Sequence, residues 1–324
     1  MRERNYGCRI VSDMTFKRHR AVVLENEKLQ IWLLLDRGGE PARWLHKPSD
    51  TDFIWQSRLG FQPPHALYPD YQMTYPGGWQ EMIPEVSYTH EYRGALVHRG
   101  EAAVAPWEMS VIQDEAEEVR IALTHQLRSL PLHIRKVIAL RSGEATVRID
   151  ETVTNEAPVA LETNWGYHLA YGAPFLQPGA EVAFPPGAEV IHPVTGSRWP
   201  WPEAEQDGEF VDLSRMAPAG TKRELLAIRA PEGRYSVHQR EQSGLGLEVR
   251  WDNAVWPYVW YWQNFAADRD APFFACEYNI GLEMFNVLPK LTLAEAAASG
   301  QALQLEPHGA ISSWLEIQVK EAQS

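Results

Sequence analysis

The sequence has 324 residues and a net charge of −13, from 43 acidic and 30 basic residues. This balance excludes nucleic acid and anionic membrane surfaces as expected partners, because both attract basic proteins. The sequence contains no run of about 18 apolar residues that would span a membrane. No apolar segment follows the charged first residues, so we expect a cytoplasmic protein without a signal peptide.

The cysteine and tryptophan contents indicate which kinds of binding site the protein could have. Cys8 and Cys276 allow one disulfide bond at most and lack the spacing of metal ligands, so we expect no metal site. The chain has 13 tryptophans and 12 tyrosines. This excess either fills a wide interface between sheets or binds carbohydrate, since indole rings stack on the C–H faces of sugars. Composition alone does not choose between these two interpretations.

The first predicted elements are short strands. Residues 20–35 form two β-type runs around a turn at 25–28, which indicates a hairpin. Residues 36–40 break the second strand, and residues 42–46 are extended again. Residues 53–76 are rich in proline and aromatic side chains without a helical period. They predict a long loop, and long ordered loops often carry function.

An antiparallel meander is the clearest pattern in the middle of the chain. Strands are predicted at residues 104–112, 119–128, 132–140 and 146–154, with short turns between the later ones. Residues 177–220 are rich in proline and predict an irregular excursion. The chain therefore alternates between a regular sheet and long connections.

The rest of the sequence, after residue 220, predicts mostly β-strands. Strands are predicted at residues 224–229, 235–239, 245–251, 258–264 and 311–319. A single helix is predicted at 293–299, alanine-rich and ended by Gly300. Many short strands with one helix predict an all-β sandwich or barrel, as one domain over residues 1–324.

Six short segments follow one another along residues 30–320. They are DRGG at 36–39, GGWQEMIP at 77–84, RGE at 99–101, WGYH at 165–168, GLE at 281–283 and LEPHGA at 305–310. In this order they resemble motifs of the aldose 1-epimerase (galactose mutarotase-like) superfamily, in a less-studied bacterial branch. The resemblance implies a β-supersandwich, in which two large antiparallel sheets pack face to face.

The resemblance also implies a reaction. A carboxylate takes the proton of the anomeric hydroxyl of a free aldose while an imidazolium protonates the ring oxygen. The ring opens, and it closes again with the other anomeric configuration. Both groups must face one sugar and have pKa values near neutral pH. The implied partner is a small sugar, and no metal or organic cofactor is needed.

The catalytic pair implied by the resemblance is His168 as acid and Glu283 as base. Without the resemblance, His168 is more readily a buried core histidine, and Glu283 is as readily an exposed strand carboxylate. Glu277 is a poorer match for the base, and Glu81 is a third candidate that better suits a sugar hydroxyl. His168 and Glu283 are therefore the residues we expect at the site.

Two departures from the superfamily pattern affect this expectation. The first family histidine falls on Arg99, with His98 one place too early, and one residue in a strand reverses the direction of a side chain. Either a bulge returns His98 to the site or Arg99 replaces it as a permanent cation. The glutamate of the terminal turn is replaced by Ala310, which cannot accept a proton.

Further residues beside the motifs are expected to bind the substrate: Arg99, Trp79, Gln80, Glu81, His98, Trp165 and Tyr167. Four other tryptophans are expected mostly in the core: Trp251, Trp256, Trp260 and Trp262.

Three functions remain open at this point. An aldose 1-epimerase-like isomerase acting on a free aldose or sugar acid is the first. A catalytically silent carbohydrate-binding protein of the same fold is the alternative, favoured by Arg99 and Ala310. A third is another isomerase or a lyase for an acidic sugar, in which Arg99 pairs with a substrate carboxylate.

Overall fold

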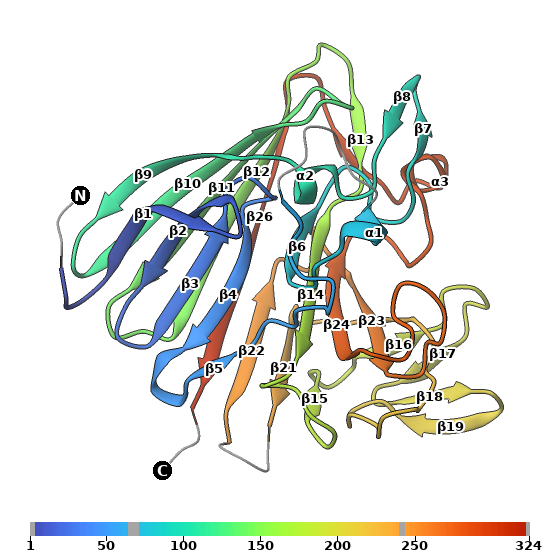
Figure 1. The fold of residues 1–324 in the computed structure, drawn as a ribbon. Coiled ribbons are helices and arrows are strands. Elements are labelled where there is room, and N and C mark those ends of the chain that lie inside the picture. The colour runs from blue at the N-terminus through green and yellow to red at the C-terminus, as the bar shows by residue number, and fades with distance from the viewer. Residues whose placement is uncertain (1–3, 64–70, 240–243, 322–324) are drawn as a thin grey trace.

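The computed structural model describes residues 4–63, 71–239 and 244–321. Its strands form three larger antiparallel sheets and three two-stranded ones (Figure 1). The all-β class and the β-supersandwich architecture expected from the sequence are confirmed. The helices of the described residues are short: α1 (Tyr71–Thr74), α2 (Glu101–Val104), α3 (Leu293–Ala298) and the 3-10 turn η1 (Lys47–Ser49).

The largest sheet has eight strands, and four of them, β9 to β12, form the meander predicted from the sequence. In sheet order they are β15 (Glu181–Ala183), β21 (Arg234–His238), β22 (Gly246–Trp251), β26 (Ala310–Lys320), β12 (Thr146–Asn155), β11 (Leu132–Arg141), β10 (Glu118–Gln126) and β9 (Glu108–Asp114). The last strand of the chain, β26, pairs with both β12 and β22. It therefore joins the meander to the later strands within one sheet.

A seven-stranded sheet carries most of the motif segments. In order its strands are β17 (Arg198–Pro200), β16 (Glu189–Ile191), β20 (Leu226–Arg229), β23 (Tyr258–Phe265), β24 (Tyr278–Phe285), β14 (Gly166–Gly172) and β6 (Trp79–Met82). The WGYH and GLE segments lie on the central neighbours β14 and β24. The GGWQ segment ends on β6, which pairs with the other edge of β14.

The N-terminal part of the chain forms a separate five-stranded sheet. Its strands are β1 (Arg9–Phe16), β2 (His19–Glu25), β3 (Leu29–Leu34), β4 (Glu40–His46) and β5 (Thr51–Asp52). Short pairs complete the structure: β7 (His90–Tyr92) with β8 (Ala95–Val97), β13 (Leu161–Thr163) with β25 (Leu303–Leu305), and β18 (Glu203–Gln206) with β19 (Glu209–Asp212).

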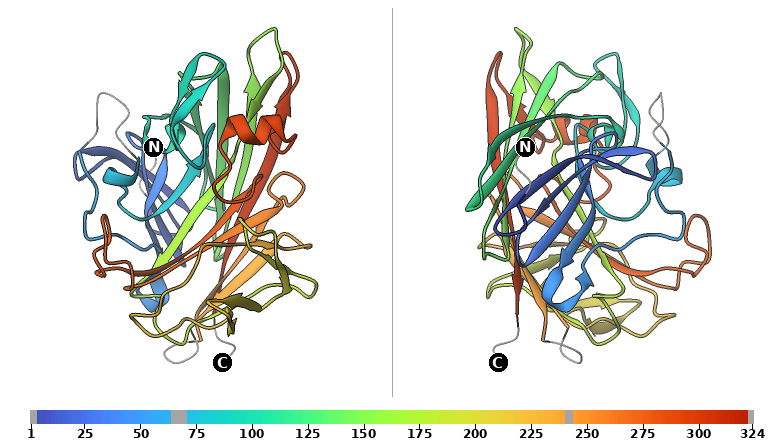
Figure 2. Two further views of the ribbon diagram at one scale, coloured as in Figure 1. Left: turned by 90° about the vertical axis from the view of Figure 1, so that its right-hand side faces the viewer. Right: turned by 60° about the vertical axis from the view of Figure 1, so that its left-hand side comes forward.

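Three expectations about local structure need correction. The strand expected at 104–112 starts later, at Glu108, because α2 occupies Glu101–Val104 and Pro106 follows. The proline-rich region 177–220 contains five short strands, β15 to β19, at the end of the molecule opposite α3 (Figure 2). The loop expected at 53–76 includes α1; its residues 64–70 lie outside the described part.

The helix expected at 293–299 is confirmed as α3, with Thr292 and Glu295 forming a capping box.

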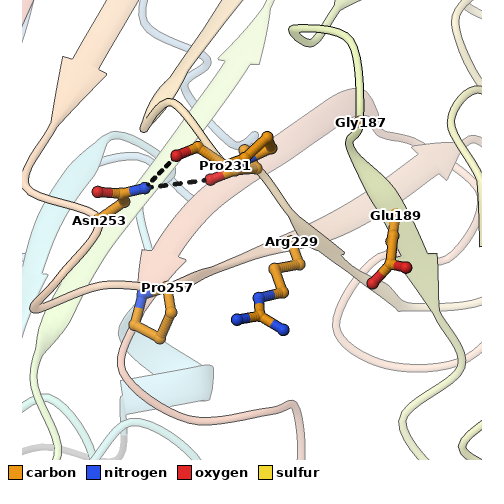
Figure 3. A pocket seen from close by; sticks show the side chains of 7 residues that line it. Gly187, Glu189, Arg229, Pro231, Asn253 and Pro257 are labelled. Atoms are coloured by element: carbon orange, nitrogen blue, oxygen red, sulfur yellow. Dashed lines mark hydrogen bonds between the residues drawn. The ribbon is translucent and has the colours of Figure 1, made fainter.

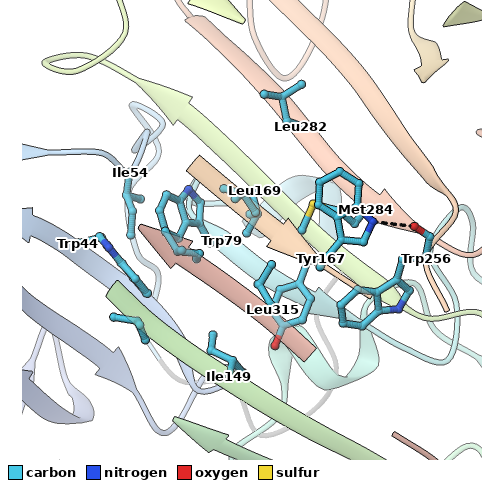
Figure 4. Packing of buried hydrophobic residues seen from close by; sticks show 14 of the residues in the cluster. Trp44, Ile54, Trp79, Ile149, Tyr167, Leu169, Trp256, Leu282, Met284 and Leu315 are labelled. Carbon is cyan, nitrogen blue, oxygen red and sulfur yellow. Dashed lines mark hydrogen bonds between the residues drawn. The ribbon is translucent and has the colours of Figure 1, made fainter. Parts of the chain in front are cut away.

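The main core lies where the three larger sheets meet. Trp44 of β4 packs against Trp79 of β6, with ring centroids 4.9 Å apart. Ile149 and Leu315 approach from the eight-stranded sheet, and Leu169 from the seven-stranded one (Figure 4). All these side chains are buried. Many of the tryptophan and tyrosine side chains therefore fill the interface between the sheets, which is one of the two interpretations that the composition allowed.

An ionic network lies inside this apolar interface. The Lys136 ammonium is 2.8 Å from Glu81 and 3.6 Å from Glu151, and all three side chains are buried. The Trp165 indole donates to Glu81 at 2.9 Å. The Tyr167 hydroxyl donates to Glu151.

Burial and the neighbouring charges shift the pKa values of Glu151 and Lys136. Burial, with the neighbouring Glu81, raises the pKa of Glu151 well above its usual value. Burial alone would lower the pKa of Lys136, but Glu81 and Glu151 together raise it. These shifts favour the protonated form of Glu151 and the charged form of Lys136.

Replacing Lys136 should leave this network without its cation. We expect Lys136→Met to lower the free energy of unfolding by about 3–5 kcal/mol, because a buried carboxylate would lose its partner. Urea unfolding followed by tryptophan fluorescence measures the change. Arg135→Met, at the adjacent exposed position of β11, is the matched control and should shift the midpoint little. Equal effects in the two variants would contradict the importance of the network.

Candidate active site

A row of side chains crosses the seven-stranded sheet on the face that points away from the main core. Gln80 of β6 pairs with His168 of β14, and Trp260 of β23 pairs with Glu283 of β24. The flanking pairs of β14 and β24 place His168 opposite Glu283. Because strand side chains alternate between faces, the row follows directly from this register.

His168 and Glu283 are close enough to share a proton. The distance from His168 Nε2 to Glu283 Oε1 is 3.3 Å. On the other side of the ring, the Tyr75 hydroxyl lies 3.2 Å from His168 Nδ1. The tyrosine and histidine rings meet edge to face at 5.1 Å between centroids. These contacts fix the imidazole plane and direct Nε2 toward the carboxyl group.

Gly281 makes room for the carboxyl group of Glu283. The two residues lie on the same face of β24, and a Cβ atom at position 281 would be 2.4 Å from Glu283 Oε1. The same Cβ atom would lie 3.2 Å from the Trp262 ring. A side chain at this position would thus displace the carboxyl group, which explains why the GLE segment needs its glycine.

The pair opens into a small cavity of about 170 Å³. The described residues that line it are mostly aromatic: Tyr71, Tyr75, Arg99, His168, Leu225, Trp260, Trp262, Phe273 and Glu283. Tyr71 and Tyr75 stack at 5.5 Å, and Trp262 packs on Phe273 at 5.4 Å. The Arg99 guanidinium lies 4.8 Å above the Tyr71 ring. A cavity of this size suits one small ring, since drug-sized ligands occupy roughly 300–1,000 Å³.

Burial controls the protonation of the pair. It raises the pKa of Glu283 to about 8, although Arg99 acts in the opposite direction. Burial, helped by Arg99, lowers the pKa of His168 to about 3. At neutral pH these two shifts favour a protonated Glu283 carboxyl group beside a neutral His168 imidazole. The cavity walls exclude the water that would stabilise a charge on either group.

The structure separates the other expected site residues by strand face. Trp79, Glu81, Trp165 and Tyr167 point into the core between the sheets, and none of them is among the described residues that line the cavity. Their motif neighbours have the opposite orientation, because side chains alternate along a strand. Of their immediate neighbours in the sequence, His168, next to Tyr167, lines the cavity.

Gln80 lies beneath the cavity wall. Its side-chain oxygen accepts a hydrogen bond from the Tyr71 hydroxyl at 3.0 Å, and its amide donates to the Gly77 carbonyl at 2.6 Å. Gln80 therefore supports Tyr71. Arg99 lines the cavity, whereas the half-buried His98 is not among the described lining residues.

The alternative bases lie elsewhere. Glu277 accepts a hydrogen bond from the Arg58 backbone N–H at 3.0 Å. Ala310 is exposed at the start of β26, on the eight-stranded sheet. Among the described residues, Glu283 is the carboxylate that lines the cavity with His168.

Several lining residues were not expected from the sequence. Trp260 and Trp262 were assigned mostly to the core, but they share the strand face of Glu283 and border the cavity. Trp251 and Trp256 are core residues as expected. Tyr71 and Tyr75 come from the long segment 53–76, whose length and aromatic content were the available signal.

A larger hollow of about 380 Å³ lies near the far end of the same sheet, between β16, β20 and the start of β23 (Figure 3). Asn253 there donates to the carbonyls of Ala230 and Pro231. Glu189 pairs with Arg198 at 3.1 Å. Asn253 and Glu189 are thus engaged within the protein, and no histidine–carboxylate pair occurs among the described residues that line this hollow.

Three general features concern the described part of the chain. It contains no cluster of three or more histidine, cysteine, aspartate or glutamate residues with the arrangement of a metal site. No helix within it is long and apolar enough to cross a membrane. Cys8 is buried and Cys276 exposed, and neither forms a disulfide bond.

Solved structures define the fold class. Slr1438 from Synechocystis sp. PCC 6803 superposes with a TM-score of 0.68 at 19% identity, covering 96% of this chain and 100% of that one. A candidate aldose 1-epimerase from Klebsiella pneumoniae has a TM-score of 0.72 at 14% identity, with 97% and 87% covered. A galactose mutarotase-like protein from Lactobacillus casei has a TM-score of 0.64 at 15% identity, with 93% and 100% covered. The chain has the galactose mutarotase-like fold, as the motif order implied.

Sequence comparison gives the family. The family described as Domain of unknown function (DUF4432) matches residues 19–319. The chain belongs to this family. No curated protein matches the chain in sequence.

The raised pKa of Glu283 predicts a specific pH dependence of stability. Its folded-state pKa of about 8 exceeds the ordinary value of 4.5, so its stabilising contribution is complete below about pH 4.5 and is lost as pH rises through 8. We therefore expect Glu283→Gln, which does not ionise, to gain stability relative to wild type between pH 5 and pH 9.

Urea unfolding at several pH values measures this difference. Glu108→Gln, at an exposed position of β9, is the control and should follow the wild-type curve. A difference between Glu283→Gln and wild type that stays constant across this pH range would show that Glu283 ionises normally in the folded protein.

Proposed function

We propose that this protein is a carbohydrate isomerase of the aldose 1-epimerase type, which interconverts the anomers of a free aldose or sugar acid. The supporting observation is the pair formed by His168 and Glu283, 3.3 Å apart at one aromatic-walled cavity. The proposed partner is a small sugar, without a cofactor. A cytoplasmic location remains part of the proposal.

The pair has the proton count that anomer exchange requires. Ring opening breaks the bond between C1 and the ring oxygen, removes the proton of the anomeric hydroxyl and delivers a proton to the ring oxygen. The site holds one transferable proton and one acceptor. Ring closure on the other face reverses both transfers, so the pair returns to its starting state without net consumption of protons.

The proton can occupy either partner during the reaction. In the unliganded site it resides on Glu283, because burial raises the pKa of this residue and lowers that of His168. Moving the proton to His168 produces the imidazolium and carboxylate that the superfamily resemblance assigns as acid and base. Both arrangements have one donor and one acceptor, and ring opening exchanges one arrangement for the other.

The cavity walls suit the two faces of a sugar ring. Trp260, Trp262 and Phe273 offer aromatic surfaces on which sugar C–H groups stack. Tyr71 and Tyr75 also line the cavity, and the Tyr75 hydroxyl orients His168. An apolar wall with a few directed polar groups is the usual design of a small-molecule site.

A catalytically silent carbohydrate-binding protein is the second candidate. The observation in its favour is Ala310, which occupies the place of the terminal base of galactose-type enzymes. Glu283 opposes this candidate, because a carboxyl group beside His168 replaces the lost group chemically. Activity measurements distinguish the two.

We expect wild type to accelerate anomer exchange of freshly dissolved sugars, measured by polarimetry or exchange NMR on a panel of aldoses and uronic acids. Glu283→Gln and His168→Ala should each lower kcat/KM by about 100- to 10,000-fold, the usual contribution of a positioned acid or base. Because the two groups act as one unit, the double variant should have a kcat/KM only a little lower than that of either single variant.

Glu277→Gln is the control, because Glu277 was the competing sequence candidate and binds the Arg58 backbone. It should retain most activity. If wild type binds a sugar but accelerates nothing, the silent binder is the correct function. If Glu283→Gln stays fully active, the base lies elsewhere.

A further inference from the structure

We propose that Tyr75 selects the reactive tautomer of His168, and that it does so when a hydroxyl group of the bound sugar accepts a hydrogen bond from it. The inference rests on the proposed function and deepens it by naming a substrate feature that controls the acid–base pair. It is carried by the contact between the Tyr75 hydroxyl and His168 Nδ1, 3.2 Å apart, at a cavity that both side chains line.

The proposed reaction requires one particular neutral form of the His168 ring. Nε2 is the ring nitrogen that faces Glu283, at 3.3 Å from Oε1, so it is the nitrogen placed to accept the proton of the anomeric hydroxyl. It can accept a proton only when it carries none. A neutral imidazole has one protonated nitrogen, so the proton must then lie on Nδ1. In this reactive tautomer, Nδ1–H donates to the Tyr75 oxygen.

The unliganded site favours the other tautomer. Tyr75 is buried, and a buried hydroxyl donates its proton wherever an acceptor is within reach. Among the described residues, the hydroxyl of Tyr75 has one hydrogen-bond partner, His168 Nδ1. Donation from Tyr75 to Nδ1 leaves the imidazole proton on Nε2, where it points toward Glu283. This form has no unprotonated nitrogen facing the carboxyl group and is therefore unreactive.

The Tyr75 ring is held in place, whereas its O–H bond can rotate. The ring stacks on Tyr71 at 5.5 Å and contacts Trp55 at 5.7 Å and Trp262 at 6.4 Å between centroids. Burial raises the pKa of Tyr75 well above its ordinary value, so the hydroxyl keeps its proton. The same oxygen can therefore donate to Nδ1 or accept from it, according to where its own proton points.

A bound sugar supplies a second acceptor for this proton. Because Tyr75 lines the cavity, a ligand hydroxyl beside it can accept the hydrogen bond from its O–H group. The Tyr75 oxygen is then free to accept from Nδ1–H of His168. The imidazole loses its proton at Nε2 and gains one at Nδ1 by exchange with solvent water as the ligand enters, so the number of protons in the site does not change.

The hydroxyl that contacts Tyr75 is separate from the two reacting oxygens of the sugar. The anomeric hydroxyl and the ring oxygen must lie at Nε2 and Glu283, whereas Tyr75 lies at Nδ1, on the other side of the imidazole ring. The substrate is therefore an aldose with a further hydroxyl at this place. A sugar without it still packs on the aromatic walls but leaves His168 in the unreactive tautomer, so the loss falls on kcat more than on KM.

Nitrogen NMR of protein with isotope-labelled histidine tests the inference directly, because protonated and unprotonated ring nitrogens give different signals. His168→Ala identifies the His168 signals among those of the 11 histidines. We expect the imidazole proton on Nε2 in the free wild type, and on Nδ1 after saturation with at least one of glucose, galactose and mannose. Tyr75→Phe keeps the aromatic ring but lacks the hydroxyl, so the same sugar should no longer move the proton.

Polarimetry on the same sugars and on their monodeoxy analogues gives a second measurement. Tyr75→Phe should lower kcat by about 10- to 100-fold with a smaller change in KM, the scale of one or two buried hydrogen bonds. In wild type, removal of one particular sugar hydroxyl should have the same effect. In Tyr75→Phe, removal of that hydroxyl should cause no further loss, because its partner is already absent.

Tyr92→Phe is the matched control, because the Tyr92 hydroxyl donates to Glu162 at 2.7 Å on the β7–β8 hairpin. It should keep both the activity and the change of tautomer, and circular dichroism would show that all variants are folded. The inference is overturned if no sugar of the panel changes the tautomer of His168 in wild type. It is also overturned if the tautomer of His168 changes in Tyr75→Phe as it does in wild type.

The two measurements separate this inference from the proposed function. If a sugar moves the His168 proton in wild type but not in Tyr75→Phe, and its anomers exchange no faster, the proposed function is wrong and the selection of the tautomer stands. If Tyr75→Phe accelerates anomer exchange as well as wild type does, the proposed function stands and the inference is overturned.

Discussion

The two-residue alternation of strands β6, β14 and β24 is the constraint on which this structure depends. Along β14, Tyr167 points into the core and His168 points away from it. The same alternation separates Glu81 from Gln80 on β6. Two polar systems therefore lie back to back on one sheet: the ionic network of Lys136 inside the sandwich, and the candidate acid–base pair outside. A shift of one residue in register would exchange them.

Desolvation governs both systems, with different results. Inside the sandwich, the Lys136 ammonium is paired with Glu81 within an apolar interface, and both side chains are buried. In the cavity, His168 Nε2 and Glu283 Oε1 lie 3.3 Å apart, close enough to exchange a proton. A pair that is neutral through a shared proton can pass that proton to a ligand, whereas a salt bridge fixed by an ammonium cannot. The pair of His168 and Glu283 therefore suits proton transfer in a reaction, whereas the salt bridge of Lys136 suits stability.

The cavity is assembled from segments that lie far apart in the sequence. Tyr71 and Tyr75 come from a long connection, Arg99 from the turn before α2, and Phe273 from the loop before β24. The sheet supplies His168, Glu283 and the two tryptophans on a rigid surface. Active sites are often built in this way: strands hold the reacting groups in place, and the connecting segments supply the other residues that surround them.

The sequence by itself determined the β class, the strands of the meander and the order of the motifs, because these depend on local alternation and on short segments. It also indicated His168, Glu283 and Arg99. The tertiary structure decided which neighbours of these residues share their face: Trp260 and Trp262 border the cavity, whereas Trp79 and Trp165 fill the core. It also decided the protonation of His168, since burial depends on side chains brought from distant segments. Local sequence sets the period of a strand, but only packing between sheets determines which face is buried.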